Sequence, residues 1–160
     1  MSTPATIRRT ARTDRPAPPP AVTLSVGLWL AAILAGFAET LVRLAGEAPP
    51  SGTEIAGRAG IYLALAVLVV QLRSGRNVIR WTVVGLLGVI GTLSLVVDPV
   101  TAMLAGASPA GFLASASTVE LAAAGLRVLH LLAVFAALAL LFHPAARTFF
   151  RRTGTARTAA

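Results

Sequence analysis

Four long apolar stretches constrain the fold of this chain more than any other feature. They cover residues 21–45, 53–73, 78–97 and 118–143. A helix of roughly 20 mostly apolar residues is long enough to cross a hydrocarbon core about 30 Å thick. Hydrophobic residues make up 56% of the chain, more than a soluble domain of this length usually carries. The sequence therefore predicts an all-α fold, a four-helix transmembrane bundle formed by residues 21–147.

The arginines are concentrated in alternate gaps between these stretches. All 14 basic residues are arginine, and eleven of them precede the first stretch, lie at or between the adjoining ends of the second and third (residues 73–80), or follow the fourth. Arginine-rich segments next to membrane spans stay on the cytoplasmic side. We therefore expect a cell-membrane protein with both termini in the cytoplasm. Residues 1–20 should form a disordered, Pro-rich tail, residues 148–160 a second cytoplasmic tail, and residues 44–53 and 99–116 external loops.

The net charge of +8 belongs to these span ends. The arginines do not form a single surface interleaved with aromatic residues, so nucleic acid is not an expected partner. Basic segments beside a membrane bind anionic headgroups of the inner leaflet, and these lipids are the expected partners. Residues 148–152 should act as an anchor in the membrane interface, into which Phe149 and Phe150 insert. We expect the bundle to fold without this segment.

Capping residues predict where two of the spans begin. Ser51 stands three residues before Glu54, and Ser117 stands three residues before Glu120. This is the spacing of a capping box, in which the two side chains satisfy exposed N–H groups of the first helical turn. The second and fourth spans should therefore begin at these serines.

Proline residues predict where the other boundaries fall. The third span should stop before Asp98, because the residue preceding a proline is disfavoured in a helix and Pro99 follows. Asp98 could then cap a short surface helix, followed by a loop over residues 106–116. Pro144 should bend or end the fourth span.

Small residues recur at helical spacing in every span, as expected where membrane helices pack closely. We interpret these stripes as packing surfaces within the bundle, with a homodimer face as the alternative. The stripes include Ser25, Ala32, Gly36 and Glu39 in the first span, Ala56, Gly60 and Ala64 in the second, Gly85, Gly88 and Gly91 in the third, and Ala133, Ala136 and Ala137 in the fourth.

Seven charged or ionisable residues lie in or near the outer third of the spans. Charge inside a membrane is costly and commonly marks a functional site. Structural explanations also exist: helix capping, helix termination, and arginines whose side chains reach the outer surface. The candidate cluster comprises Glu39, Arg43, Arg58, Asp98, Glu120, Arg127 and His130.

Arg127 is the hardest of these to explain without a partner, because it lies about two turns inside the fourth span. Glu39 lies at a similar height in the first span, and first and fourth spans commonly neighbour each other in a closed bundle. We therefore predict a Glu39–Arg127 ion pair. Arg43 or Arg58 could instead pair with Glu39, and Asp98 or Glu120 with Arg127. His130 follows Arg127 by one turn and fits either a proton relay or a hydrogen-bonded core residue.

No motif for catalysis, metal binding or cofactor binding stands out. The chain has no cysteine, which excludes disulfides and thiolate chemistry. His130 and His143 are about 20 Å apart along one helix, so they cannot bind the same haem iron. We expect a protein that is not an enzyme and that holds no metal or cofactor.

Three segments give the chain a resemblance to the small, uncharacterised four-span integral membrane proteins of high-GC actinobacteria. They are the Pro/Arg-rich N-terminal tail, the turn SGRNVIRW at residues 74–81, and the ending HPAARTFFR at residues 143–151. The resemblance implies a fold and a membrane location, and no activity.

Two functions remain open at this point. The first is a non-enzymatic accessory or assembly protein that binds a membrane-protein partner or a second copy of itself. The second is a small proton-coupled transporter that uses the region of Glu39, Arg127 and His130. The length and the acidic first span resemble small multidrug exporters. However, Glu39 is off-centre, Arg43 lies one turn away, and the charge bias of the loops is strong.

Overall fold

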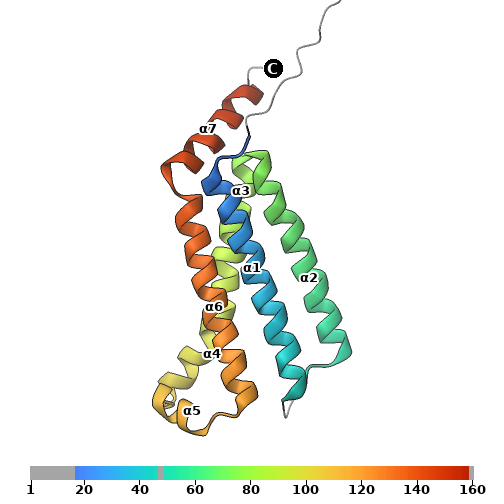
Figure 1. The fold of residues 1–160 in the computed structure, drawn as a ribbon, viewed down its shortest axis with the longest axis vertical. Helices are drawn as coiled ribbons and strands as arrows, with labels where there is room; N and C mark the ends of the chain where they lie inside the picture. Colours follow the sequence, from blue (N-terminus) through green and yellow to red (C-terminus); the bar gives the residue numbers. More distant parts are fainter. Residues whose placement is uncertain (1–16, 47–48, 159–160) are drawn as a thin grey trace, which may run out of the picture.

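The computed structural model describes residues 17–46 and 49–158, and every regular element in this part of the chain is a helix (Figure 1). Four helical segments are long and apolar enough to cross a membrane, as predicted. Residues 1–16 of the predicted tail lie outside the described residues. The elements are α1 (Pro20–Val42), η1 (Arg43–Ala45), α2 (Gly52–Val70), η2 (Gln71–Ser74), α3 (Asn77–Val83), η3 (Val84–Gly91), α4 (Thr92–Leu104), α5 (Pro109–Ser115), α6 (Thr118–Leu141) and α7 (Pro144–Thr158).

Both predicted capping boxes are confirmed. Ser51 Oγ accepts a hydrogen bond from the Glu54 N–H at 3.3 Å, and the Glu54 carboxylate accepts one from the Ser51 N–H at 2.7 Å. Ser117 and Glu120 form the same reciprocal pair at the start of α6. Each box satisfies two N–H groups that the first turn leaves without helical partners.

Helix α1 is the central helix of the bundle and packs along α6 for most of its length. The predicted small stripe of α1 explains this packing, because Ser25, Ala32 and Gly36 are all buried. Ser25 Oγ donates a hydrogen bond of 2.8 Å to the Ala137 carbonyl of α6. The first and fourth spans are therefore neighbours, as predicted.

The remaining helices are covered much less. In α2 only Val69 is buried, and the stripe of Ala56, Gly60 and Ala64 is exposed, so the prediction that it packs within the bundle was wrong. In the third span, Gly88 approaches α6 so closely that an added β-carbon would lie 3.2 Å from Leu138. The apolar surfaces that these helices expose are the normal lipid-facing surfaces of a membrane bundle.

The third span is longer than predicted and is not a regular α-helix. It runs from Asn77 to Leu104, with the eight-residue π-helical stretch η3 in its middle. Pro99 lies inside α4, so the prediction that the span ends before Asp98 was wrong. Pro99 has no N–H to donate to the Leu95 carbonyl, but one missing bond costs less than leaving a whole turn of backbone unpaired in hydrocarbon.

Two segments predicted to be irregular are helical. Part of the expected 106–116 loop forms α5, where Ser108 Oγ accepts from the Gly111 N–H at 3.0 Å. The expected C-terminal tail forms α7, which begins at Pro144 after α6 has ended. Phe149 and Phe150 belong to the bundle core, 7% and 1% exposed, and do not reach an outer surface. The prediction that these rings act only as an interfacial anchor was therefore wrong.

The two ends of the bundle differ in charge, because the acidic residues that the structure describes all lie toward one end and five arginines lie at the other (Figure 1). The start of α1, the turn between α2 and α3, and helix α7 share one end, which we call the arginine-rich end because it carries Arg73, Arg76, Arg80, Arg147 and Arg151. Gly75 in this turn has φ 69°, a conformation that favours glycine. Elements η1 and α5, the end of α4 and the starts of α2 and α6 form the opposite end.

Candidate functional site

Most of the predicted polar residues meet in one cavity, in the half of the bundle nearer the opposite end. The cavity has a volume of about 270 Å³ and lies between four helical segments. Each span contributes polar residues at the same height of the bundle. Polar residues that are far apart in the sequence therefore lie together in one site. Its lining is Gly36, Glu39 and Thr40 from α1, Arg43 from η1, Arg58 and Tyr62 from α2, Ser94, Leu95 and Asp98 from α4, and Arg127 from α6.

Glu39 organises the charges of this cavity. Its Oε1 atom accepts a hydrogen bond of 2.7 Å from Arg127 Nη2, which confirms the predicted pair between the first and fourth spans. The same oxygen also accepts from Arg43 Nε at 3.1 Å and Nη2 at 2.9 Å, one turn along the chain. Glu39 is only 6% exposed. Two charge-assisted interactions offset the cost of burying its carboxylate.

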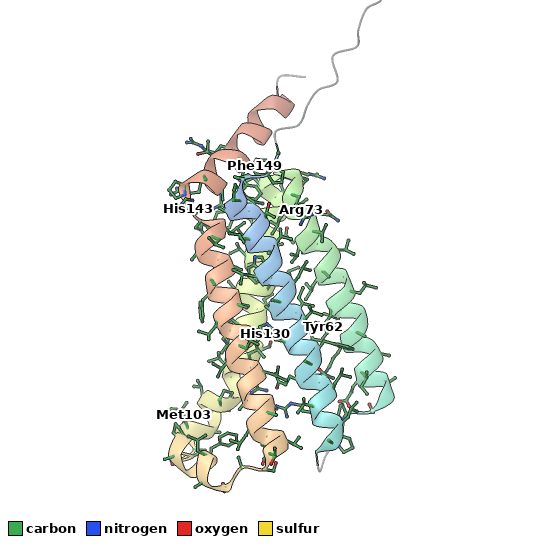
Figure 2. All side chains as sticks on the ribbon, viewed as in Figure 1. Tyr62, Arg73, Met103, His130, His143 and Phe149 are labelled. Atoms are coloured by element: carbon green, nitrogen blue, oxygen red, sulfur yellow. The ribbon has the colours of Figure 1, made fainter. Side chains whose placement is uncertain are left out.

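A second polar group of the cavity region is built around Gly36. A β-carbon at this position would lie 3.1 Å from both His130 Nδ1 and the Tyr62 hydroxyl. Figure 2 shows Tyr62 of α2 and His130 of α6 at the same level of the bundle. Because Gly36 has no side chain, the Tyr62 and His130 side chains can both pack against α1 at this position. His130 Nδ1 and Arg127 Nε are buried and have no hydrogen-bond partner among the described residues.

The cavity keeps charge that is not neutralised internally. Its lining holds three guanidinium groups and two carboxylates, a formal excess of one positive charge. In the part of the chain that the structure describes, ion pairs join Glu39 to two arginines, while Arg58 and Asp98 form none. These two exposed side chains stand on α2 and α4, and are the groups of the cavity with charge available to a ligand or partner.

Of the seven candidates, five line the cavity and His130 lies beside it, while Glu120 belongs to the cap of α6. Sequence reasoning missed Tyr62, Ser94 and Thr40. Tyr62 and Ser94 are each one helical turn from a predicted charged residue, Arg58 and Asp98 respectively. That spacing places them on the same face of their helices and was the signal available to find them.

Charged side chains, some paired and some not, dominate the lining of the cavity, and the second histidine of the chain lies outside it. His143, the other histidine, is exposed at the junction of α6 and α7, where its Nδ1 accepts from the Ala145 N–H at 3.4 Å. Among the described residues, no group of histidine and carboxylate side chains is arranged to hold a metal ion. No protein-family model, curated protein or solved structure matches this chain.

Proposed function

We propose that this chain is a non-enzymatic accessory or assembly protein of the cell membrane that acts by contact with a membrane-protein partner or a second copy of itself. The arginine-rich end lies in the cytoplasm, and the opposite end faces outward. Arginine asymmetry supports this orientation, because arginine-rich loops resist translocation.

The observation that carries the contact function is an apolar hairpin at the opposite end, residues 99–117, which includes the end of α4 and all of α5. It contains no charged residue. Leu104 is 83% exposed and Leu113 is 66% exposed. A contiguous, uncharged apolar projection at a membrane boundary is typical of a surface that binds another protein or the membrane interface.

A photo-crosslinking amino acid at Leu104 tests this proposal in intact membranes. We expect a discrete protein adduct, and mass analysis will tell a partner from a second copy of the chain. The matched control is the same amino acid at Leu63 of α2, which is 69% exposed but faces outward from a transmembrane segment. If position 104 gives only lipid adducts, as position 63 should, the hairpin is an interfacial element and the contact function is wrong.

The orientation can be tested separately, because the chain has no cysteine of its own. Single cysteines at Arg76 and at Ala107 report on the two ends of the bundle. A membrane-impermeant maleimide added to intact cells should label position 107 only. Labelling of position 76 from outside would reverse the proposed topology.

A small proton-coupled transporter is the alternative, and the cavity of about 270 Å³ with the buried, unpartnered Nδ1 of His130 favours it. The network around Glu39 counts against it. A carboxylate oxygen that already accepts from two guanidinium groups must give up those interactions before the group can carry a proton.

Proton flux into vesicles that contain the purified protein and a pH-sensitive dye separates the two functions. The contact function predicts the same flux for the wild type, for Glu39→Gln and for empty vesicles. A flux that requires the wild-type protein and disappears in Glu39→Gln would replace our proposal with transport.

A further inference from the structure

Arg80, at the arginine-rich end, is buried and has no acidic partner in the part of the chain that the structure describes. It is 7% exposed and lies in α3. Its Cζ atom lies 4.5 Å from the ring centroid of Phe142, 5.4 Å from that of Phe150 and 5.6 Å from that of Trp81. Aromatic faces attract a cation but do not neutralise it. The buried Nε atom of Arg80 has no hydrogen-bond partner within residues 17–46 and 49–158.

The surroundings of Arg80 add positive charge. Arg147 of α7 is close enough to repel it electrostatically. Among the described residues, the acids are Glu39, Glu54, Asp98 and Glu120, and all of them lie in the other half of the bundle. No acidic side chain in the described part of the chain is therefore available to balance this pair of like charges.

Helix α7 carries a shallow basic hollow, and Arg147, which interacts electrostatically with Arg80, is part of its lining. The hollow has a volume of about 230 Å³ and is lined by Pro144, Arg147, Thr148 and Arg151. Thr148 donates its hydroxyl proton to the Pro144 carbonyl, so this hydroxyl has no proton left for an anion. The donors of the hollow are therefore its two arginines. Arginine is the residue best suited to bind phosphate, because its planar guanidinium presents paired donors.

We propose that the hollow on α7 binds the phosphate of an anionic lipid headgroup, which Arg147 and Arg151 contact and which balances the buried charge of Arg80. A lipid is favoured over free phosphate by the position of the hollow. Trp81 and Phe142 beside Arg80 are 54% and 39% exposed, and their rings pack edge to face at 5.8 Å. Such aromatic residues mark the level where headgroups meet acyl chains. Basic pockets beside transmembrane helices are known to hold anionic headgroups.

Thermal unfolding of the full chain in dodecyl maltoside tests this site without any protein partner, so failure here would leave the proposed contact function untouched. Phosphatidylglycerol should raise the unfolding temperature, whereas phosphatidylcholine and inorganic phosphate should not. An equal rise with inorganic phosphate would mean a free-anion site, and an equal rise with phosphatidylcholine would mean a non-specific lipid effect. Either result overturns the proposal.

Arg147→Gln gives the sharper test, because it should destabilise the protein only when the lipid is present. Without lipid, this variant should unfold at the same or a higher temperature than the wild type, since repulsion of Arg80 is removed. With phosphatidylglycerol it should be the less stable protein, and its apparent dissociation constant should rise about fivefold, the factor expected for one lost arginine–headgroup interaction.

The matched control is Arg73→Gln, an exposed arginine of η2 at the same end of the bundle. It should keep the stabilisation by phosphatidylglycerol. An equal loss in both variants would mean that the charge of the whole end attracts lipid, without a defined site. Arg80→Lys keeps the charge and should keep the stabilisation. Loss of lipid binding in Arg80→Lys, with Arg147→Gln unaffected, would place the anion elsewhere and overturn the proposal.

Discussion

Substitution of Glu39 should destabilise the bundle more than substitution of either arginine that it binds. Glu39→Gln removes the shared acceptor and leaves Arg127 inside a transmembrane helix without a counter-charge. Insertion scales give a cost of about 2.5–3.5 kcal/mol for an unpaired arginine near a span centre. Arg127 has 24% of its side chain exposed, so part of this cost is recovered by rearrangement toward the cavity. We expect a loss of about 2–3 kcal/mol.

The two arginines should differ from each other for the same reason. Arg127→Gln leaves Glu39 still paired with Arg43, so the loss should be smaller, about 1–2 kcal/mol. Arg43 has 49% of its side chain exposed, and Arg43→Gln removes an interaction of the (i, i+4) type, which is worth about 0.3–0.5 kcal/mol. The predicted order of destabilisation is therefore Glu39→Gln, then Arg127→Gln, then Arg43→Gln.

Unfolding by SDS in mixed micelles, with helicity followed by circular dichroism, measures these differences. The double variant with glutamine at positions 39 and 127 completes a thermodynamic cycle. Coupling of about 1 kcal/mol or more is expected for residues in direct contact, whereas independent sites add within about 0.3–0.5 kcal/mol. A coupling energy inside that additive range would refute a stabilising ion pair between α1 and α6.

Three further substitutions test the packing, all by the same unfolding measurement. Gly36→Ala should cost about 1–3 kcal/mol, because its β-carbon would crowd His130. The control Gly27→Ala meets nothing within 4 Å and should be neutral or stabilising. Equal effects of the two substitutions would contradict the close approach of His130 to Gly36. Ser25→Ala should cost about 0.6 kcal/mol, a typical value for one hydrogen bond between membrane helices, and no change would show that the bond is not stabilising. Phe150→Ala should cost about 3–5 kcal/mol, because its ring belongs to the core. A loss below ~0.5 kcal/mol, typical of a surface substitution, would mean that α7 is a surface tail.

The features that sequence reasoning predicted correctly are those that the hydrocarbon core and local chemistry dictate. Span length follows from bilayer thickness, and the starts of α2 and α6 follow from two side chains three residues apart. The Glu39–Arg127 pair also follows, because an arginine two turns inside a span needs a counter-charge and only a few acids lie at that height. Arg43 was named as a competitor, and it shares the same oxygen.

The errors arose where tertiary packing or the membrane overrides a local preference. Pro99 disfavours the helix before it in water, but hydrocarbon penalises an unpaired turn of backbone more strongly, so α4 continues. The basic composition of residues 148–160 predicted a tail. Helix α7 instead buries Phe149 and Phe150 in the bundle, while Arg147 and Arg151 on either side of them stay exposed. Composition carries no information on that difference in exposure.

The irregular third span connects these observations. A π-helical turn rotates the residues that follow it relative to a regular α-helix, and η3 comes immediately before the part of α4 that carries Ser94 and Asp98. The direction in which Ser94 and Asp98 face therefore depends on η3. No simple periodicity in the sequence predicts this π-helical stretch. With Pro99 one residue beyond Asp98, the α4 wall of the cavity lies between two departures from regular helix. π-Helical turns are rare and are frequently found at functional sites. Asp98, which forms no ion pair in the described part of the chain, is thus the cavity carboxylate whose position depends least on internal pairing. Glu39 therefore joins α1 to α6, whereas Asp98 is an exposed carboxylate on the α4 wall of the cavity.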